Sequence, residues 1–383
     1  MKIFLSFLQS GRQHGIPAFS FWEYYIKNGI AEAGHEWTET PDVDWALGLV
    51  PKSNEEQSKW KQEAWGKTLA WLKKNPADIF LSYLFPQQVD EDAIRQIQKL
   101  GIPCVNFFCD HVREFSNVPI QFSAFDLNWV PEYKALPLYQ KAGYSYINLP
   151  MPIWVEPGLR VPVTEINSRI TFIGSKDIQR QFLFEGILSN DPSLPLDIYG
   201  KGWGEIEQAE QSFNGGYTTG KKLVYQFHFM RKNGIVPYLR KLKQRNLPGP
   251  ISISLKSKVQ GNISFEQYNQ LTARSMVTVG VNRFPSYRFP FNAPGTYSRL
   301  RDIEAPMLGA CYLTEYTEGL EHLYDIGAEI EVYHNTIDFI EKTGELQKNP
   351  DKRKALRIAG QQKALNEHHI PGSINKILQK IRC

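Results

Sequence analysis

Cysteine is scarce in this 383-residue sequence, and no pair has the close spacing that binds zinc. The four thiols lie far apart or inside strand-like runs, at Cys104, Cys109, Cys311 and Cys383. This spacing excludes the common structural zinc sites, and we expect no metal site in the chain. We instead expect buried free thiols, which are typical of proteins in a reducing cytoplasm.

Long apolar runs are absent as well, since no stretch of 18 apolar residues occurs and no helix is expected to span a membrane. Residues 1–11 have a basic residue and a brief apolar run, as a signal peptide does, but the run is too short and Arg12 follows at once. We interpret it as a first strand. Apolar residues make up 42% of the chain and aromatic residues 13%, and its length favours two domains of about 150 to 200 residues.

Acidic residues are missing from one segment. Lys221–Lys258 contains ten Lys and Arg and no Asp or Glu, so it carries a formal charge of +10 in a chain of net charge +4. Two helix-like stretches within it, Lys222–Lys232 and Val236–Arg245, have apolar faces, so the segment reads as an inserted helical pair. It is either a solvated insertion or a docking element for an anionic membrane or polysaccharide; docking on a membrane would be peripheral, at its inner face.

The N-terminal part predicts a parallel α/β domain over residues 1–155. A strand at Lys2–Leu8, a loop with two glycines and a helix at Phe19–Ala33 open a Rossmann-like half, although no G-x-G-x-x-G is present. Ser53 with Glu56 forms a capping box for a following helix. Five further strands are predicted at Ala46–Val50, Asp78–Leu84, Cys104–Cys109, Ala124–Pro131 and Tyr144–Pro150.

Polar side chains follow two of these strands. His14 lies in the loop after the first strand, and Asp110 and His111 follow the strand at Cys104–Cys109. Ligands of open parallel sheets bind at the carboxyl ends of the strands, so these residues are candidate functional groups. The alternative is that they are ordinary loop and turn residues.

A second α/β domain is predicted over residues 165–355, with terminal helices at 356–383. After a strand at Arg169–Ile173, Gly174 and Ser175 precede a helix that carries Arg180, and Lys176 lies between. Backbone N–H groups at a helix N-terminus, together with two cations, suit a phosphate. A strand at Leu196–Tyr199 ends in the turn Gly200–Trp203.

The most informative stretch is Thr296–Leu320. Arg301 and Glu304 are three residues apart, so on a helix they share a face. A guanidinium suits phosphate oxygens and a carboxylate can accept hydrogen bonds from vicinal ribose hydroxyls, so the pair fits a nucleotide diphosphate. A surface ion pair is the alternative. Gly309 would let the helix end tightly against a strand at Ala310–Leu313.

The run RDIEAPMLGA at residues 301–310, followed by Glu315, Gly319–Leu320, DIGAEI and VYHN, resembles the spore-protein-like (CgeB-like) branch of the group 1 glycosyltransferases. The resemblance covers roughly Ile263–His369. It implies the GT-B fold, in which two Rossmann-like domains face a cleft and the last helix crosses back to the N-terminal domain. The large class to which this branch belongs is a retaining one.

The resemblance also implies roles for particular residues. Glu304 would hold the donor ribose and Arg301 would lie near the diphosphate. The two donor loops would be formed by Gly174, Ser175, Lys176 and Arg180, and by Gly200 and Trp203. Asn282 would touch the donor sugar or phosphate, and His14, Asp110 and His111 would face the acceptor as candidate catalytic groups.

We therefore expect a metal-independent glycosyltransferase that moves a sugar from a nucleotide-diphosphate sugar to a glycan, lipid-linked or small-molecule acceptor. We expect that it binds no nucleic acid and needs no separate cofactor. Lys176, Arg180 and Arg301 would neutralise the leaving diphosphate. One departure stands out, because the position eight before Glu304, a glutamate in many retaining members, is Thr296. An inactive nucleotide-sugar-binding protein and a sugar-nucleotide epimerase of the same fold remain alternatives.

Overall fold

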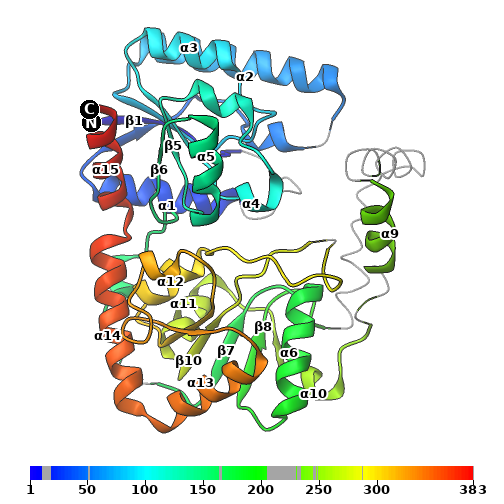
Figure 1. The fold of residues 1–383 in the computed structure, drawn as a ribbon. Helices are drawn as coiled ribbons and strands as arrows, with labels where there is room; N and C mark the ends of the chain where they lie inside the picture. Colours follow the sequence, from blue (N-terminus) through cyan, green and yellow to red (C-terminus); the bar gives the residue numbers. More distant parts are fainter. Residues whose placement is uncertain are drawn as a thin grey trace. The chain divides into compact units, whose positions relative to one another are not determined.

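The structure is a computed structural model that describes residues 1–10, 19–50, 52–163, 166–204, 230, 234–244, 247, 249–286 and 288–382. It divides into two compact units (Figure 1). Unit 1 comprises Met1–Glu156 and Lys363–Cys383, and unit 2 comprises Pro157–Gln362. His14 and nearly all of the predicted helix Lys222–Lys232 lie outside the described residues.

Unit 1 is built on a six-stranded parallel sheet in the order β2-β1-β3-β4-β5-β6. Every residue of β3 and β4 is buried, as expected for central strands covered on both faces. The strands are β1 (Lys2–Ser6), β2 (Glu36–Thr38), β3 (Ile79–Ser82), β4 (Cys104–Phe107), β5 (Leu127–Trp129) and β6 (Tyr146–Ile147).

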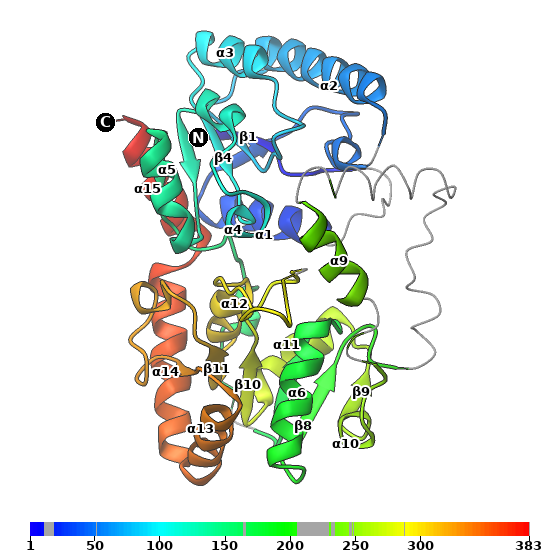
Figure 2. The ribbon, with the colours of Figure 1, turned by 45° about the vertical axis from the view of Figure 1, so that its right-hand side comes forward.

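Helices lie on both faces of this sheet (Figures 1 and 2). They are α1 (Phe19–Glu32), α2 (Asn54–Lys74), α3 (Glu91–Lys99), α4 (His111–Glu114), α5 (Leu136–Ala142) and α15 (Ile370–Arg382), with short 3-10 turns η1 (Ala46–Leu49), η2 (Ile120–Ala124) and η3 (Tyr133–Ala135). The capping box predicted at Ser53 and Glu56 is present at the start of α2. The α/β character of this part of the chain is confirmed.

One strand of unit 1 was predicted at the wrong place. Ala46–Val50 is not a strand, because Ala46–Leu49 forms η1 and the second strand along the chain is β2. The Asp44 carboxylate accepts a hydrogen bond from the Leu47 N–H at 2.8 Å and so starts the turn. Gly48 lies so close to Trp60 that an added Cβ would be 2.3 Å from its ring. The apolar run is therefore buried as a turn against α2.

The C-terminal helix α15 returns to unit 1, as the fold prediction required. Ile370 at its start lies against Gly29 of α1, where an added Cβ would be 2.6 Å from the isoleucine side chain. His369 forms an isolated parallel bridge with Ile153. Both views show α15 beside α1 (Figures 1 and 2).

Unit 2 contains a second six-stranded parallel sheet, in the order β12-β11-β10-β7-β8-β9. The strands are β7 (Ile170–Ile173), β8 (Leu196–Tyr199), β9 (Val259–Gly261), β10 (Val277–Gly280), β11 (Tyr312–Glu315) and β12 (Glu331–Tyr333). The core includes Phe172, Phe184, Trp203 and Leu313. A second Rossmann-like domain is thereby confirmed, although β9 was not predicted.

The helices of this part of the chain are α6 (Ile178–Asn190), α9 (Ile235–Gln244), α10 (Ile253–Lys256), α11 (Phe265–Arg274), α12 (Arg301–Met307), α13 (Thr336–Lys348) and α14 (Pro350–Glu367), with 3-10 turns η4 (Pro157–Leu159) and η5 (Leu320–His322). Gly309 ends α12 with φ +73°, the left-handed conformation typical of a helix end. The strand that follows begins at Tyr312, two residues later than predicted.

Three thiols, Cys104, Cys109 and Cys311, are buried and free, as predicted, while Cys383 lies outside the described residues. In the described part of the chain, no helix combines the length and hydropathy needed to cross a bilayer.

Candidate functional site

The loops that follow β7 and β8 approach each other at the carboxyl edge of the unit 2 sheet. Gly200 has φ +131°, and an added Cβ there would lie 2.5 Å from the carbonyl oxygen of Gly174, so only glycine fits. The Trp203 indole donates a hydrogen bond to the same oxygen at 2.8 Å and is buried against Phe184. Trp203 therefore supports the loop from the core and does not offer its ring to a donor.

The start of α6 is already capped by a side chain of the protein. The Asp177 carboxylate accepts hydrogen bonds from the N–H groups of Gln179 and Arg180, both at 2.9 Å. The Gly174 N–H donates to the Tyr199 carbonyl at 2.8 Å. The N–H groups of Gly174, Gln179 and Arg180 are therefore occupied by acceptors of the protein, and the phosphate contact expected for Ser175 stays a prediction.

The cations of this loop remain suited to an anion. The Arg180 guanidinium folds back on its own loop and donates to the Ser175 carbonyl at 2.6 Å. The Lys176 ammonium has no hydrogen bond or ion pair with any residue that the structure describes, and burial lowers the pKa of Lys176. The side chains of Lys176 and Arg180 therefore supply positive charge at this edge.

Three arginines lie within electrostatic reach of one another, and we refer to Arg180, Arg299 and Arg301 as the arginine cluster. Burial lowers the pKa of Arg180 to about 10; Asp177 opposes the shift, and the charges of Arg299 and Arg301 add to it. Arg299 donates to the Tyr297 hydroxyl at 2.6 Å, and Arg301 donates to the Ile173 carbonyl. Arg299, which the sequence reading did not single out, thus belongs to the site.

Two guanidinium N–H groups of the arginine cluster lack an acceptor. The Nε atoms of Arg180 and Arg301 are buried, and no residue in the described ranges accepts a hydrogen bond from either. The Arg180 Nε has an ion-pair contact with Asp177 at 3.4 Å, outside hydrogen-bond geometry. A buried donor left unpaired costs about 1 to 3 kcal/mol, so these groups suit an anionic ligand with several oxygens.

Glu304 lies next to the arginine cluster and is only 6% exposed. Because this carboxylate is buried, the interpretation of Arg301 and Glu304 as a surface ion pair is wrong. Instead the Tyr268 hydroxyl of α11 donates to Glu304 Oε2, and the Arg301 guanidinium carbon lies 5.4 Å from the centre of the Tyr268 ring. Burial, with the Glu304 charge second, raises the pKa of Tyr268, which keeps it a phenol donor.

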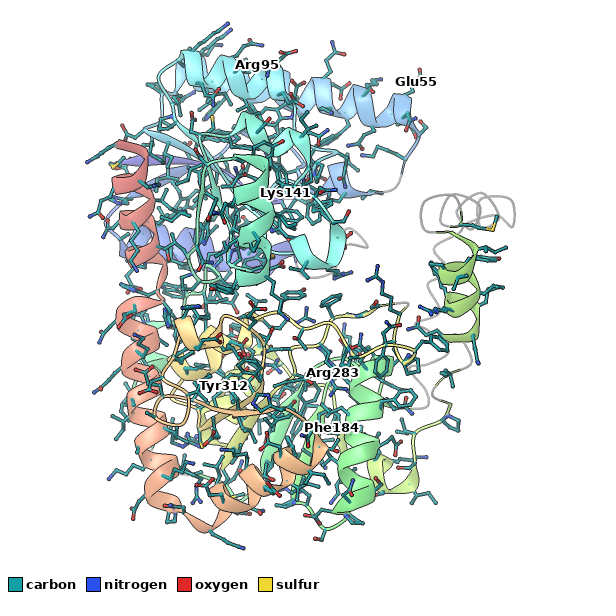
Figure 3. All side chains as sticks on the ribbon, viewed as in Figure 1. Glu55, Arg95, Lys141, Phe184, Arg283 and Tyr312 are labelled. Carbon is teal, nitrogen blue, oxygen red and sulfur yellow. The ribbon has the colours of Figure 1, made fainter. Side chains whose placement is uncertain are left out.

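A buried carboxylate, Asp302, fixes the start of α12. It accepts hydrogen bonds from Tyr312 at 2.8 Å and from Thr314 at 2.9 Å, and its other oxygen accepts from Ser298 and from the Arg299 N–H, both at 2.9 Å. Tyr312 is labelled in Figure 3. Burial raises the pKa of Asp302, while these hydrogen bonds favour its charged form. Asp302 therefore positions both Arg299 and the helix that carries Arg301 and Glu304.

Asn282 belongs to this buried network and not to a free surface of the site. Its amide nitrogen donates to the Glu315 carbonyl at 2.8 Å and to Thr314 at 3.2 Å. We therefore assign Asn282 to the support of the two strands it joins, in place of the donor contact that the sequence suggested. The neighbouring Arg283, labelled in Figure 3, pairs with Glu315 at 2.7 Å.

His111 is buried in an aromatic cluster of unit 1 and is not placed to act as a base. Its Nε2 lies 2.5 Å from the Tyr139 hydroxyl, and its ring packs edge-on against Phe108 and Phe122. Burial lowers the pKa of His111 to about 3, so the imidazole is neutral at physiological pH. The sequence placed His111 at the end of β4 but could not show that its ring turns inward.

The other candidates for the acceptor side are less constrained. Asp110 is half-buried at the N-terminus of α4, and its carboxylate lies 3.9 Å from the Arg113 guanidinium. It remains a candidate functional group of unit 1. His14 lies outside the described residues.

The Asp-x-Asp pattern, a spacing of carboxylates that can bind a metal ion, is used structurally in this chain. Asp-x-Asp occurs twice, at Asp42–Asp44 and Asp90–Asp92. Asp44 accepts a hydrogen bond from Ser10 at 2.9 Å, and Asp90 caps α3. Across the described ranges, no group of three or more His, Cys, Asp or Glu side chains is arranged to hold a metal ion.

Solved structures with the same overall fold cover almost the entire chain. Sucrose-phosphate synthase from Thermosynechococcus elongatus aligns with a TM-score of 0.58 at 10% identity, over 99% of this chain and 98% of that chain. HepE from Anabaena, in complex with UDP and glucose, aligns with a TM-score of 0.56 at 10% identity, over 99% and 100%. A putative UDP-N-acetylglucosamine 2-epimerase from Listeria monocytogenes aligns with a TM-score of 0.50 at 12% identity, over 100% and 95%.

At these identities the likeness establishes the GT-B fold alone. A comparison with curated proteins finds no match. The model of the family described as glycosyl transferase-like matches residues 179–379, which contain the arginine cluster and Glu304. Because this match spans more than half of the sequence, the chain belongs to the glycosyl transferase-like family and is a glycosyltransferase.

Proposed function

We propose that the protein transfers a sugar from a nucleotide-diphosphate sugar to an acceptor hydroxyl, without a metal ion and with retention of the anomeric configuration. The observation that carries this proposal is the arginine cluster beside Glu304, with two buried Nε groups that no described residue satisfies. A diphosphate next to a ribose has the charge and the oxygen atoms that this arrangement lacks.

The arginine cluster has the chemistry that a leaving diphosphate needs. Negative charge grows on the diphosphate as the bond from the sugar to its oxygen breaks, and preorganised guanidinium groups stabilise that charge. Arg301 and Arg180 are held in place by the carbonyls of Ile173 and Ser175, so little reorganisation is required. Lys176 supplies a further cation from the same loop. These side chains fill the role that a bound cation has in other transferases.

Glu304 suits the nucleoside part of the donor. An ionised carboxylate offers only acceptors, so it can take hydrogen bonds from both hydroxyls of a ribose. Tyr268 holds one of its oxygens, which fixes the orientation of the carboxylate before a ligand arrives. The Arg301 guanidinium lies over the Tyr268 ring, so the residue that would bind the diphosphate and the residue that orients Glu304 are in contact.

Retention is implied by the family resemblance alone, and the chain's own residues suit a step without a covalent intermediate. Thr296 replaces the acid found eight positions before Glu304 in many members, so that position supplies no carboxylate nucleophile. The acceptor hydroxyl would attack the anomeric carbon from the side that the diphosphate leaves. Its proton would pass to the departing phosphate oxygen, which needs no protein base. The inward position of His111 agrees with this route.

Nucleotide binding in the presence of a chelator tests the donor site. UDP is the first choice because HepE, which shares the fold, has been solved with UDP, and GDP and dTDP complete the panel. We expect one nucleotide to raise the melting temperature in EDTA, since a ligand at 100 times its Kd stabilises the folded state by about 2.7 kcal/mol. Binding that appears only when Mg²⁺ is added would contradict metal independence.

Incubation with the matching nucleotide sugar and no acceptor separates the three possible activities. A transferase should release nucleotide by slow hydrolysis, an epimerase should produce the epimeric nucleotide sugar, and a binding protein should do neither. Once an acceptor is found, proton NMR of the product gives the anomeric configuration. An inverted product would overturn retention and would call for a base among His14 and Asp110.

A further inference from the structure

Helix α9 is attached to unit 2 by its C-terminal end. The Gln244 amide donates hydrogen bonds to the carbonyls of Ser286 and Phe289, at 2.8 and 2.9 Å. The Arg240 guanidinium donates to Asn292 at 3.4 Å. These contacts hold α9 against the loop that follows β10.

Three apolar side chains of α9 are exposed. Ile235 is 62% exposed, and Val236 and Leu239 are each 56% exposed. Positions one, two and five of a helix lie on one face, so the three side chains form a continuous strip. Single apolar residues on a protein surface are ordinary, but a strip of three branched side chains facing water is a feature of interaction surfaces.

Two cations of the same helix lie near Phe291, beside this strip. Lys243 is exposed on the same face, and its ammonium lies 5.6 Å from the ring centre of Phe291, which is itself 38% exposed. The Arg240 guanidinium lies 5.8 Å from the same ring. We refer to this set of residues as the α9 patch: Ile235, Val236, Leu239, Arg240, Lys243 and Phe291.

The sequence around the α9 patch is positively charged throughout. Lys221–Lys258 contains ten Lys and Arg and no acidic residue, whereas the rest of the chain carries a net negative charge. A run of this kind attracts anionic surfaces over about one Debye length, roughly 8 Å at physiological ionic strength. Helix α9 itself carries Arg240, Lys241 and Lys243 and no acidic residue, so the exposed apolar strip belongs to a cationic helix.

We infer that the α9 patch docks on an anionic lipid bilayer, with α9 lying in the plane of the interface. Branched apolar side chains on one face of a helix enter the boundary between headgroups and acyl chains, and flanking Lys and Arg reach lipid phosphates. An anionic polysaccharide would be held by the cations alone and would gain nothing from the apolar strip. The inference does not depend on the nucleotide site.

Vesicle sedimentation of the full chain tests this. The protein should sediment with vesicles of phosphatidylglycerol and phosphatidylcholine, and binding should weaken as salt rises to about 0.15 M because charge attraction is screened. Vesicles of phosphatidylcholine alone should bind far less. No binding to the anionic vesicles, or equal binding to both kinds, would overturn the inference.

Paired variants separate the two parts of the patch. Ile235→Ser with Leu239→Ser should lower the partition coefficient at least about tenfold, because the apolar contact is lost. Ile253→Ser is the matched control, since Ile253 is 90% exposed on α10 and lies outside the patch. Lys243→Gln should lower binding about fivefold, the loss expected for one cation near an anionic surface, whereas Lys99→Gln in unit 1 should not.

Two further comparisons complete the experiment: the nucleotide affinity of each variant, and the vesicle binding of the two kinds of variant. Every variant should keep the nucleotide affinity of the wild type, which shows that the fold is intact and that docking is separate from the donor site. If the double serine variant still binds anionic vesicles as the wild type does, while Lys243→Gln does not, electrostatic attraction alone accounts for the binding. That result would overturn bilayer docking in favour of a soluble polyanion such as an acidic polysaccharide.

Discussion

The Glu304 carboxylate is held by a phenol from another helix, so its replacement affects ligand binding more than the fold. We expect Glu304→Ala to weaken nucleotide binding by about 1.5 to 3 kcal/mol, because hydrogen bonds from ribose to a charged acceptor are lost. Isothermal titration gives the Kd. Glu266→Ala is the control, since Glu266 is an exposed residue of α11. An unchanged Kd for every nucleotide that binds the wild type would remove Glu304 from the site.

Tyr268 should act on the ligand through Glu304. Tyr268→Phe removes the hydroxyl that donates to Glu304 but keeps the ring beneath Arg301. We expect nucleotide affinity to fall by about 0.5 to 1.5 kcal/mol, with little change in melting temperature. Tyr268→Ala should weaken binding further, because the contact of the guanidinium with the ring is lost too. Equal affinities for wild type and Tyr268→Phe would show that the hydroxyl does not position the carboxylate.

The burial of His111 should make the free energy of unfolding depend on pH. Burial lowers the pKa of His111 from 6.5 to about 3, so between these values the unfolded chain binds a proton that the folded protein excludes. The free energy of unfolding should therefore fall as the pH falls, by up to about 1.4 kcal/mol per pH unit. We expect His111→Gln to reduce this slope between pH 6.5 and 5, measured by urea unfolding. Identical slopes would mean that His111 titrates normally in the folded protein.

Some of the candidate site could be predicted from the sequence, because helical spacing is local information. Arg301 and Glu304 share a face of α12 for that reason. Tyr268 and Arg299 could not be found in this way, since their roles depend on which helix packs against Glu304 and on how Asp302 holds the preceding loop. The ring of His111 could equally have turned outward, because a strand end does not fix the orientation of the next side chain.

At the scale of elements, β12 is joined to two helices by one buried carboxylate. Glu331 accepts a hydrogen bond from Lys342 of α13 at 3.1 Å and from Lys352 of α14 at 2.8 Å. Burial opposes its ionisation, but the hydrogen bonds from Lys352 and Lys342 outweigh burial and lower the pKa of Glu331 below its ordinary value of 4.5. Its stabilising effect is thus present above pH 4.5 and is lost as the pH falls through the lowered pKa.

Glu331→Gln should therefore lower the free energy of unfolding at pH 7 by about 1 to 2 kcal/mol, less than for a fully buried pair because both ammonium groups are partly exposed. The difference from wild type should shrink below pH 4. Thermal unfolding at several pH values measures it. Glu345→Gln is the control, because that partner of Lys352 is exposed and should contribute under about 0.5 kcal/mol. A deficit that stays constant from pH 7 to pH 3 would contradict the assigned ionisation.

Long elements with clear end signals were the most predictable. The capping box of Ser53 and Glu56 starts α2 where the sequence placed it, and Asp90 starts α3. The short strands β2 and β9 were missed because three residues carry too little periodicity to distinguish a strand from a loop. The turn η1 was mistaken for a strand because its buried apolar run is shaped by contact with Trp60, a residue of another element.

At the scale of the molecule, unit 1 is assembled from the N-terminal and the C-terminal parts of the sequence. A substitution at Gly29 tests whether the C-terminal helix packs there. A Cβ added at Gly29 would lie 2.6 Å from Ile370 of α15, whereas a Cβ added at Gly66 in α2 would meet no other part of the protein within 4 Å. Gly66→Ala should stabilise the protein by about 0.5 to 1 kcal/mol through helix propensity. Gly29→Ala should instead destabilise it by about 1 to 3 kcal/mol through overpacking. Melting temperatures that rise for both variants would mean that α15 is not seated on α1.

The return of α15 to unit 1 has a consequence for synthesis on the ribosome. Domains usually complete their folding in the order in which they are made. Here unit 1 is complete only when Lys363–Cys383 has been translated, which is after unit 2. The buried side chains of α15 that join unit 1 last include Ile370, Ile374 and Ile377. At about 5 to 20 residues per second, that delay is roughly 10 to 45 seconds. A ribosome stalled after Gln362 would carry a unit 1 that has all six strands of its sheet but lacks α15.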